Sequence, residues 1–414
     1  MEFSKSNAQN IYNEELAKFN EFKTLGLKLD MSRGKPNKKQ LDLSNGLLDV
    51  LNSSSDCTGK IDYRNYGLLD GIPEAKELFA NLFDVSQDEI IIMGNSSLNI
   101  MYDTVQRAMQ FGVCGEKPLN YQGEIKWLCP VPGYDRHFAV TEAFGIKMIP
   151  VKMNSDGPDM DQIEELVKDE QVKGIWCVPK FSNPQGIVYS DEVVTRFAKL
   201  KPAAKDFRIY WDNAYAIHYV FEDVKLLNLL EEAKKYGNED LVYMFGSTSK
   251  CTFAGAGVAW VCASVNNVKD ILKHLTFQTI GYNKINQLAH VRFFKTAENL
   301  KLHMAKHAEL LKPKFTAVLD KLDANVKEIC HWDIPKGGYF ISIDLPNGTA
   351  KRVVSLCKEA GVVMTGAGST YPYKQDPNDS NLRIAPSLPS VEELDKAMDV
   401  FTCCIKLAWA ELNK

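Results

Sequence analysis

The chain has 414 residues, of which 45% are hydrophobic and 25% charged, and its net charge is −4. This composition is ordinary for a globular protein, and the length favours two domains over a single core. The slightly acidic balance argues against a nucleic-acid-binding surface, which needs clustered basic residues. No apolar run is long enough to cross a bilayer, and the polar N-terminus shows no secretion signal, so no membrane partner is expected.

The ten cysteines follow no regular spacing and include no C-x-x-C pair. This pattern predicts neither a zinc site nor a disulfide framework. Scattered thiols with apolar neighbours suit a reducing compartment. We therefore expect a cytoplasmic protein that needs no metal.

Helical and strand-like patterns alternate from about residue 72. The stretch 73–83 has helical spacing, with Pro73 in its first turn. Short apolar runs predict strands at 89–93, 126–130, 146–151, 173–178, 207–212, 241–245 and 257–263. Helical patterns separate several of them, near 159–169, 190–200, 224–236 and 266–276. Apolar strands between helices predict an α/β fold with a mainly parallel sheet covered on both faces.

The pattern changes after about residue 300. A long helix over 300–325 is followed by strands and helices, and Ser390 with Glu393 forms a capping-box signal for the last helix. We expect a large domain over 46–300 and a smaller α+β domain over 301–414. The segment 1–45 carries an apolar stripe, so we expect it to pack with the small domain.

Polar residues follow several of the expected strands, where ligands bind in open α/β sheets. The first such place is Gly94, Asn95 and Ser96, between a strand and a helix. Backbone N–H groups at the start of a helix suit a phosphate group. The same residues also suit an ordinary helix cap.

Three further strand ends carry an amide, a carboxylate and an amine. Asn183 lies in the stretch NPQG, and Asp212 ends an apolar run with Tyr215 three residues later. Lys250 lies in GSTSK between two apolar runs. Taken singly, these are a turn, an exposed aspartate and a solvated lysine. Together they are what pyridoxal 5′-phosphate requires, because a lysine condenses with its aldehyde and an aspartate stabilises its protonated ring nitrogen.

These motifs resemble those of fold-type I pyridoxal-phosphate enzymes, and class I aminotransferases in particular, over nearly the whole chain. NPQG is similar to the family's Asn-Pro-x-Gly, DNAY to its Asp-x-x-Tyr, and STSK to its Ser-x-x-Lys. PGYDRH, NLRIAP, SRGKP and NYGLLDG also resemble family segments. The resemblance implies pyridoxal 5′-phosphate as cofactor, amino acid and 2-oxo acid substrates, and a homodimer with shared active sites.

The resemblance also implies a role for each matching residue. Lys250, Asp212 and Tyr215 are expected to be catalytic, with His137 behind the aspartate, and Tyr134 is expected to stack on the ring. The residues expected to bind the cofactor are Gly94, Asn95, Ser96, Tyr134, Asn183, Asp212, Tyr215, Ser247, Lys250 and, from the neighbouring subunit, Tyr66. The residues expected to bind substrate are Arg33, Gly34, Asn183, Lys284 and Arg383, whose guanidinium would grip the α-carboxylate.

Two positions depart from the family pattern. Val258 stands where the family usually carries an arginine for the phosphate, which leaves Arg33 or Lys35 as candidate cations. The stretch TIGYNKINQLAH lacks the arginine that aspartate aminotransferases use for the side-chain carboxylate, and offers Lys284 instead. The chain thus resembles a divergent aspartate aminotransferase branch.

We expect transamination from aspartate to 2-oxoglutarate. An aminotransferase for alanine or aromatic amino acids and a pyridoxal-phosphate-dependent β-lyase or cyclase are the alternatives. A cofactor-sensing regulator is disfavoured, because the family match begins near residue 32 and leaves too few residues before it for a winged helix.

Overall fold

The computed structural model describes residues 3–414. Their central sheet has eight strands in the order β2-β9-β8-β7-β6-β3-β4-β5. Its strands are β2 (Ile90–Ile92), β3 (Lys126–Val131), β4 (Lys147–Asn154), β5 (Gly157–Pro158), β6 (Val172–Cys177), β7 (Arg208–Asp212), β8 (Val242–Ser247) and β9 (Ala259–Ala263). The pairs from β4 through β3, β6 and β7 to β8 are parallel, while β9, β2 and β5 run antiparallel to their neighbours. The predicted mainly parallel α/β sheet is confirmed.

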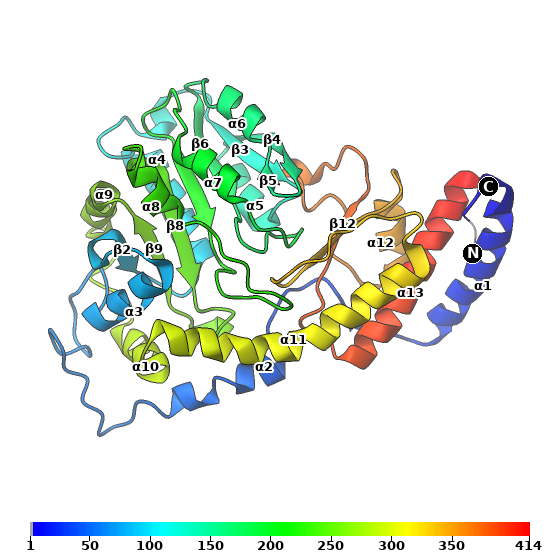
Figure 1. Ribbon diagram of the computed structural model, residues 1–414, viewed down its shortest axis with the longest axis horizontal. Coiled ribbons are helices and arrows are strands. Elements are labelled where there is room, and N and C mark those ends of the chain that lie inside the picture. The colour runs from blue at the N-terminus through cyan, green and yellow to red at the C-terminus, as the bar shows by residue number, and fades with distance from the viewer. Residues whose placement is uncertain (1–2) are drawn as a thin grey trace.

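Helices cover both faces of this sheet, as Figure 1 shows. They are α3 (Pro73–Phe83), α4 (Ser97–Phe111), α5 (Asp135–Ala143), α6 (Met160–Leu166), α7 (Asp191–Ala198), α8 (Leu229–Lys234), α9 (Val265–Leu275) and α10 (Lys284–Phe294). Along β7, Ile209 and Trp211 belong to the core on one face, and Tyr210 to the core on the other. This alternation explains why the strand is apolar throughout.

The helix predicted over 224–236 begins five residues later, at Leu229. The side chain of Asn228 accepts hydrogen bonds from the backbone N–H groups of Leu230 and Glu231. An asparagine in this capping position marks the start of a helix, and the prediction overlooked it.

The C-terminal part of the chain forms a second layered unit. It contains α11 (Ala297–Val326), β10 (Ile341–Asp344), α12 (Ala350–Glu359), β11 (Val362–Val363), β12 (Asn381–Ile384) and α13 (Val391–Asn413). The N-terminal elements α1 (Ala8–Thr24) and β1 (Leu29–Asp30) lie against this unit, where Ile11 packs with Trp409 and β1 pairs with β11. Figure 1 shows α1 beside α13, and α11 running from the sheet towards them.

Short helical turns complete the described chain. They are α2 (Lys38–Asp42), η1 (Lys5–Asn7), η2 (Asn45–Leu48), η3 (Gln87–Glu89), η4 (Leu119–Tyr121), η5 (Glu239–Leu241), η6 (Ala254–Ala256) and η7 (Pro372–Lys374). Across residues 3–414, every helix is too short or too polar to span a bilayer.

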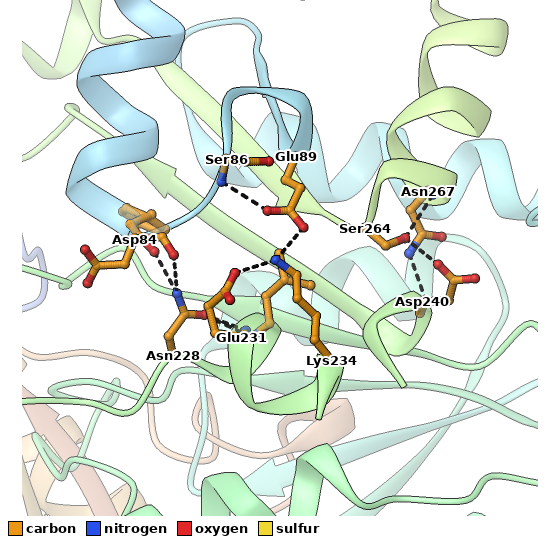
Figure 2. A network of polar contacts seen from close by, with 11 residues as sticks. Asp84, Ser86, Glu89, Asn228, Glu231, Lys234, Asp240, Ser264 and Asn267 are labelled. Atoms are coloured by element: carbon orange, nitrogen blue, oxygen red, sulfur yellow. Dashed lines mark hydrogen bonds and ion pairs between the residues drawn. The ribbon is translucent and has the colours of Figure 1, made fainter. Parts of the chain in front are cut away.

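A polar network stabilises the edge of the sheet beside β2 (Figure 2). The buried carboxylate of Glu89 accepts from the backbone N–H of Ser86 and pairs with Lys234 on α8 at 2.7 Å. Asn228 donates to the carbonyls of Phe83 and Asp84, each at 2.9 Å. The network therefore ties α8 to the end of α3, and its contacts are structural.

Candidate active site

The loops that follow β6, β7 and β8 meet at one cavity of about 190 Å³. Because these strands are parallel and in register, with Asp212 beside Phe245, their carboxyl ends lie at the same edge of the sheet. The cavity is lined by Ser96, Ser97, Leu98, Tyr134, Val178, Asn183, Asp212, Ala214, Tyr215, Ser247, Ser249 and Lys250. Most of the predicted cofactor-binding residues are thus brought together.

Asp212 is a buried carboxylate with one partner. Its Oδ2 lies 3.0 Å from His137 Nε2, and the imidazole stacks on Trp176 with 4.6 Å between ring centroids. Its Oδ1 is buried and has no hydrogen-bond partner among residues 3–414. A buried, unpaired carboxylate oxygen is costly, and a protonated ring nitrogen of a bound cofactor would satisfy it. This excludes the exposed-aspartate interpretation and fits pyridoxal 5′-phosphate.

Lys250 follows β8 and reaches the same cavity. Its Nζ lies 4.9 Å from the centre of the Tyr215 ring. Part of the side chain is open to the cavity, yet burial of the amine lowers the pKa of Lys250, an effect that the charge of Asp212 opposes. A lowered pKa increases the fraction of neutral amine, which is the form that attacks an aldehyde. The solvated-lysine interpretation does not hold.

The start of α4 forms another wall of the cavity. Ser96 caps the helix, accepting from the backbone N–H of Asn99 at 3.4 Å, so the cap interpretation is correct for this residue. Ser97, Ser247 and Ser249 line the cavity beside this cap. The first backbone N–H groups of α4 lie at the same end of the helix. Such a helix start attracts an anion, which makes it the natural place for a phosphate group.

Arg383 lies on β12, and hydrogen bonds hold one of its two terminal nitrogens. Its Nη1 donates to Asn183 Oδ1 at 3.1 Å and to Asp135 Oδ1 at 2.9 Å. Its Cζ lies 4.5 Å from the centre of the Phe340 ring. Its Nε is buried without a partner among the described residues. The free edge of the guanidinium, formed by Nε and Nη2, is suited to a carboxylate, which binds arginine through two parallel hydrogen bonds.

Residues 3–414 match the family described as aspartate amino-transferase. The chain belongs to this family. The aspartate aminotransferase of Corynebacterium glutamicum is 47% identical over 408 residues, which are 97% of this chain and 94% of that protein. A putative aminotransferase of Mycolicibacterium smegmatis is 46% identical over 93% of this chain and 92% of its own.

Solved structures agree with this assignment. The crystal structure of an aspartate transaminase from Corynebacterium glutamicum superposes with a TM-score of 0.97 at 46% identity, covering 100% of this chain and 98% of that chain. The predicted fold-type I architecture and the predicted aminotransferase activity are confirmed. Aminotransferases of this fold use pyridoxal 5′-phosphate, as the sequence motifs predicted.

Two members of the predicted phosphate cradle have other contacts in this family member. Asn95 accepts a hydrogen bond from the backbone N–H of Gly257 at 2.6 Å, and its carbonyl accepts from Ser249 Oγ at 3.0 Å. Gly94 and Asn95 line a neighbouring, larger cavity. Asn95 thus holds the loop that contains Lys250 and Ser249, and direct contact of Gly94 or Asn95 with a cofactor stays a prediction.

The residue at the position of the family's phosphate arginine packs in the core. Val258 is buried among apolar side chains, and its backbone N–H donates to Thr248 Oγ1 at 2.9 Å. Lys250 is the only lysine or arginine among the described residues that line the cavity. The phosphate charge must therefore be met by backbone N–H groups, by hydroxyls, or by cations from outside this cavity.

Besides Gly94 and Asn95, five predicted site residues do not line the cavity: Arg33, Gly34, Tyr66, Lys284 and Arg383, of which Arg383 adjoins it through Asn183. Arg33 is exposed, and Tyr66 is 76% exposed. Lys284 is buried at the start of α10, where desolvation lowers the pKa of its amine, and no ion-pair or hydrogen-bond partner for this amine is found within residues 3–414. Their roles stay predictions.

The structure adds two contacts that sequence reasoning did not identify. Asp135 binds Arg383, and the only sequence signal for it was its place directly after Tyr134. Gly34 lies against Phe340, because a Cβ at this glycine would stand 2.4 Å from Phe340 Cζ. The glycine lets the predicted substrate loop pass over the ring on which Arg383 is stacked.

Proposed function

We propose that the chain transfers the amino group of aspartate to a 2-oxo acid, with 2-oxoglutarate as acceptor. The observation that carries this proposal is the convergence of the Lys250 amine and the unpartnered Oδ1 of Asp212 on one cavity. The choice of aspartate is supported by family membership and by the name of the relative from Corynebacterium glutamicum.

Three side chains have a defined task in the chemistry of this proposal. When bound, pyridoxal 5′-phosphate supplies an electron sink for the charge that develops at the substrate Cα. The Lys250 amine removes the proton from Cα and returns it as a general base and acid. The unpartnered Asp212 Oδ1 would hold the protonated ring nitrogen. Arg383 binds the α-carboxylate through its free edge, which points the Cα–H bond at Lys250.

The remaining side chains hold the ring in place. Tyr134 packs edge-on against His137 with 4.9 Å between ring centroids and is available to stack on a bound ring. Asn183 and Tyr215 line the same cavity and can donate to the ring oxygen. For the second carboxylate of aspartate, Arg33 and Lys284 are the proposed cations. Lys284 is the stronger candidate, because desolvation lowers the pKa of its amine and a bound carboxylate would stabilise the charged form.

We infer that the active form is a homodimer. Large apolar side chains are exposed, including Leu48 (70%), Phe277 (75%) and Ile280 (64%) besides Tyr66. A cavity of about 970 Å³, lined by Leu48, Phe253, Tyr282 and Ile285 among others, opens beside Gly94 and Asn95. Exposed apolar surface of this kind marks an interaction site. A second copy that covers it would bring Tyr66 towards the neighbouring active site.

Subunit mixing tests the shared site. Lys250→Ala and Tyr66→Ala subunits should each be inactive alone, and mixing them should restore part of the activity, because one hybrid site keeps both groups. Mixing each variant with itself is the control. No recovery after verified subunit exchange would contradict the shared site.

The substrate is tested by adding single amino acids to the cofactor-loaded enzyme. Aspartate should convert the bound cofactor to its amine form fastest, followed by glutamate, with oxaloacetate as the product from aspartate. Alanine and phenylalanine are the comparison donors, and a preference for either would reject the dicarboxylate. Release of ammonia in place of amino transfer would identify a β-lyase.

A cytoplasmic location is also proposed. All ten cysteines lie within the described residues and all are free thiols, which suits a reducing compartment.

A further inference from the structure

Four of the seven histidines lie buried around the segment 248–252, which we call the lysine loop. They are His218, His290, His303 and His307. None of the four lines the cavity that Lys250 enters. They form the rear side of the lysine loop, and the proposed chemistry uses none of them.

One of these histidines reaches the carbonyl oxygen of Cys251. His303 Nε2 lies 2.9 Å from this oxygen, and Ser44 Oγ donates to it at 3.3 Å. His307 lies behind His303, with 3.2 Å between their Nε2 atoms. Both histidines come from α11, where a spacing of four residues places them on the same face. A carbonyl can only accept, so His303 must carry a hydrogen on Nε2.

Gln40 determines which nitrogen of His307 carries a hydrogen. The carboxamide oxygen of Gln40 accepts from the backbone N–H and the side-chain amide of Asn37, at 3.1 and 3.0 Å. Its Nε2 therefore faces His307 Nδ1, at 3.2 Å, and donates to it. With Nδ1 accepting, neutral His307 has its hydrogen on Nε2, which lies 3.2 Å from His303 Nε2.

The rest of the lysine loop is held by neutral groups as well. Tyr339 accepts from Gln40 at 3.0 Å and donates to the carbonyl of Lys250 at 3.4 Å. His290 Nδ1 lies 2.8 Å from the carbonyl of Asn286, so its Nε2 accepts from Thr248 Oγ1 at 3.1 Å. His218 Nε2 lies 3.7 Å from Cys251 Sγ, and its Nδ1 is buried without a partner among the described residues.

We propose that His303, with His307 directly behind it, is a positioning residue that fixes the Cys251 carbonyl and thereby aims the side chain of Lys250 into the cavity. This inference rests on the proposed role of Lys250. The carbonyl that His303 holds belongs to the peptide between Cys251 and Thr252, and Tyr339 holds the carbonyl of the preceding peptide, which is that of Lys250. A rotation of these peptides would swing the amine away from Asp212. Ser44 and His303 are two buried donors on one carbonyl, and they leave it a single orientation.

The charge state of the rear side suits this task. Burial lowers the pKa of His303, assisted by the charge of Lys306, and lowers the pKa of His307 to about 3. The other groups that face the pair are Ser44, Cys251, Gln40 and Tyr339, and none of them is charged at neutral pH. His303 therefore donates its hydrogen bond without placing a second buried cation beside Lys250, where no anion could pair with it.

Paired substitutions test the inference. His303→Leu and His307→Leu remove the donors, whereas His303→Gln and His307→Gln keep an N–H group at a similar reach. Val318→Ala, in the same helix but in the C-terminal core, is the control for loss of stability alone. In the cofactor-loaded enzyme, the leucine variants should exchange the amide hydrogens of 248–252 at least 10-fold faster. Their kcat should fall about 10- to 100-fold with KM within 3-fold, and the glutamine variants should recover most of both.

Three results would overturn the inference. The first is a leucine variant that loses as much stability as Val318→Ala but keeps native exchange in the lysine loop and native kcat. The second is a glutamine variant that is no better than its leucine counterpart. If the leucine variants fail to fold, His303→Asn, whose amide is too short to reach Cys251, takes their place, and native behaviour would be the third. Amide exchange does not depend on the substrate, so it separates this inference from a wrong choice of amino acid.

Discussion

The cavity side and the rear side of the lysine loop use different chemistry. The cavity side carries charges with an unused face: Asp212 has a free oxygen, and Arg383 has a free edge. The rear side is uncharged, with histidines, a tyrosine and threonines that hydrogen-bond to one another and to the lysine loop. Unpaired charges thus lie where a ligand can bind, whereas neutral donors lie where only other parts of the chain are in contact.

The largest expected effect comes from the amine that lies between the two sides. Lys250→Ala should abolish turnover, by at least about 10⁴-fold, the upper range for a general acid–base group, while the fold and cofactor binding persist. Steady-state kinetics and the absorbance of retained cofactor measure this. Borohydride reduction of the native holoenzyme should label Lys250, and labelling of another lysine would reject the assignment.

On the cavity side, Asp212→Asn keeps the size of the side chain but removes its charge. We expect proton removal from the substrate Cα to slow by about 10²–10³-fold, the range for losing one preorganised electrostatic group. Exchange of the Cα hydrogen in heavy water measures this step directly. Asp223→Asn, at a half-exposed ion pair with Lys180, is the matched control and should be silent. An unchanged exchange rate in Asp212→Asn would show that the ring nitrogen has another partner.

The second-carboxylate cations give a smaller, substrate-dependent effect. Lys284→Ala or Arg33→Ala should raise KM for aspartate by about 10- to 100-fold, as expected for one charge-assisted hydrogen bond, and leave alanine unaffected. Comparison of kcat/KM for the two donors measures the difference. Equal losses for both donors would move that residue to the cofactor phosphate.

The buried histidines of the rear side should lower the stability of the fold in acid. Burial lowers the pKa of His290 to about 4 and that of His307 to about 3, against an ordinary value near 6.5. The unfolded chain therefore binds protons that the folded chain excludes. Their contribution to stability is complete above pH 6.5 and is lost as pH falls towards 4 and then 3. The slope is about 1.4 kcal/mol per pH unit for each histidine.

Urea unfolding at several pH values measures this slope. His307→Gln should flatten it over the range from pH 6.5 to about 3, because glutamine does not titrate. His331→Gln, at an exposed histidine, is the control and should leave it unchanged. Equal slopes in the native protein and in His307→Gln would show that His307 is protonated in the folded state.

The sequence by itself determined the sheet and the cavity side of the site. Apolar runs between helical patterns are the local signature of buried parallel strands, and the residues after them share one sheet edge by geometry alone. Asn183, Asp212 and Lys250 could therefore be placed together without any knowledge of packing. Boundaries that depend on one capping side chain, such as the start of α8, were missed.

Only the tertiary structure decided the rear side. Gln40, Cys251, His303 and Tyr339 come from distant parts of the chain, and no spacing along the sequence predicts that they meet. Each of these residues is ordinary in its local sequence. A histidine on a helix, for example, is more often a surface or core residue than a donor to a catalytic loop. Asp135 was hidden for the same reason, because its partner Arg383 is 248 residues away. Local sequence patterns encode the direction and burial of a segment, whereas the pairing of polar side chains across a core depends on how the segments pack.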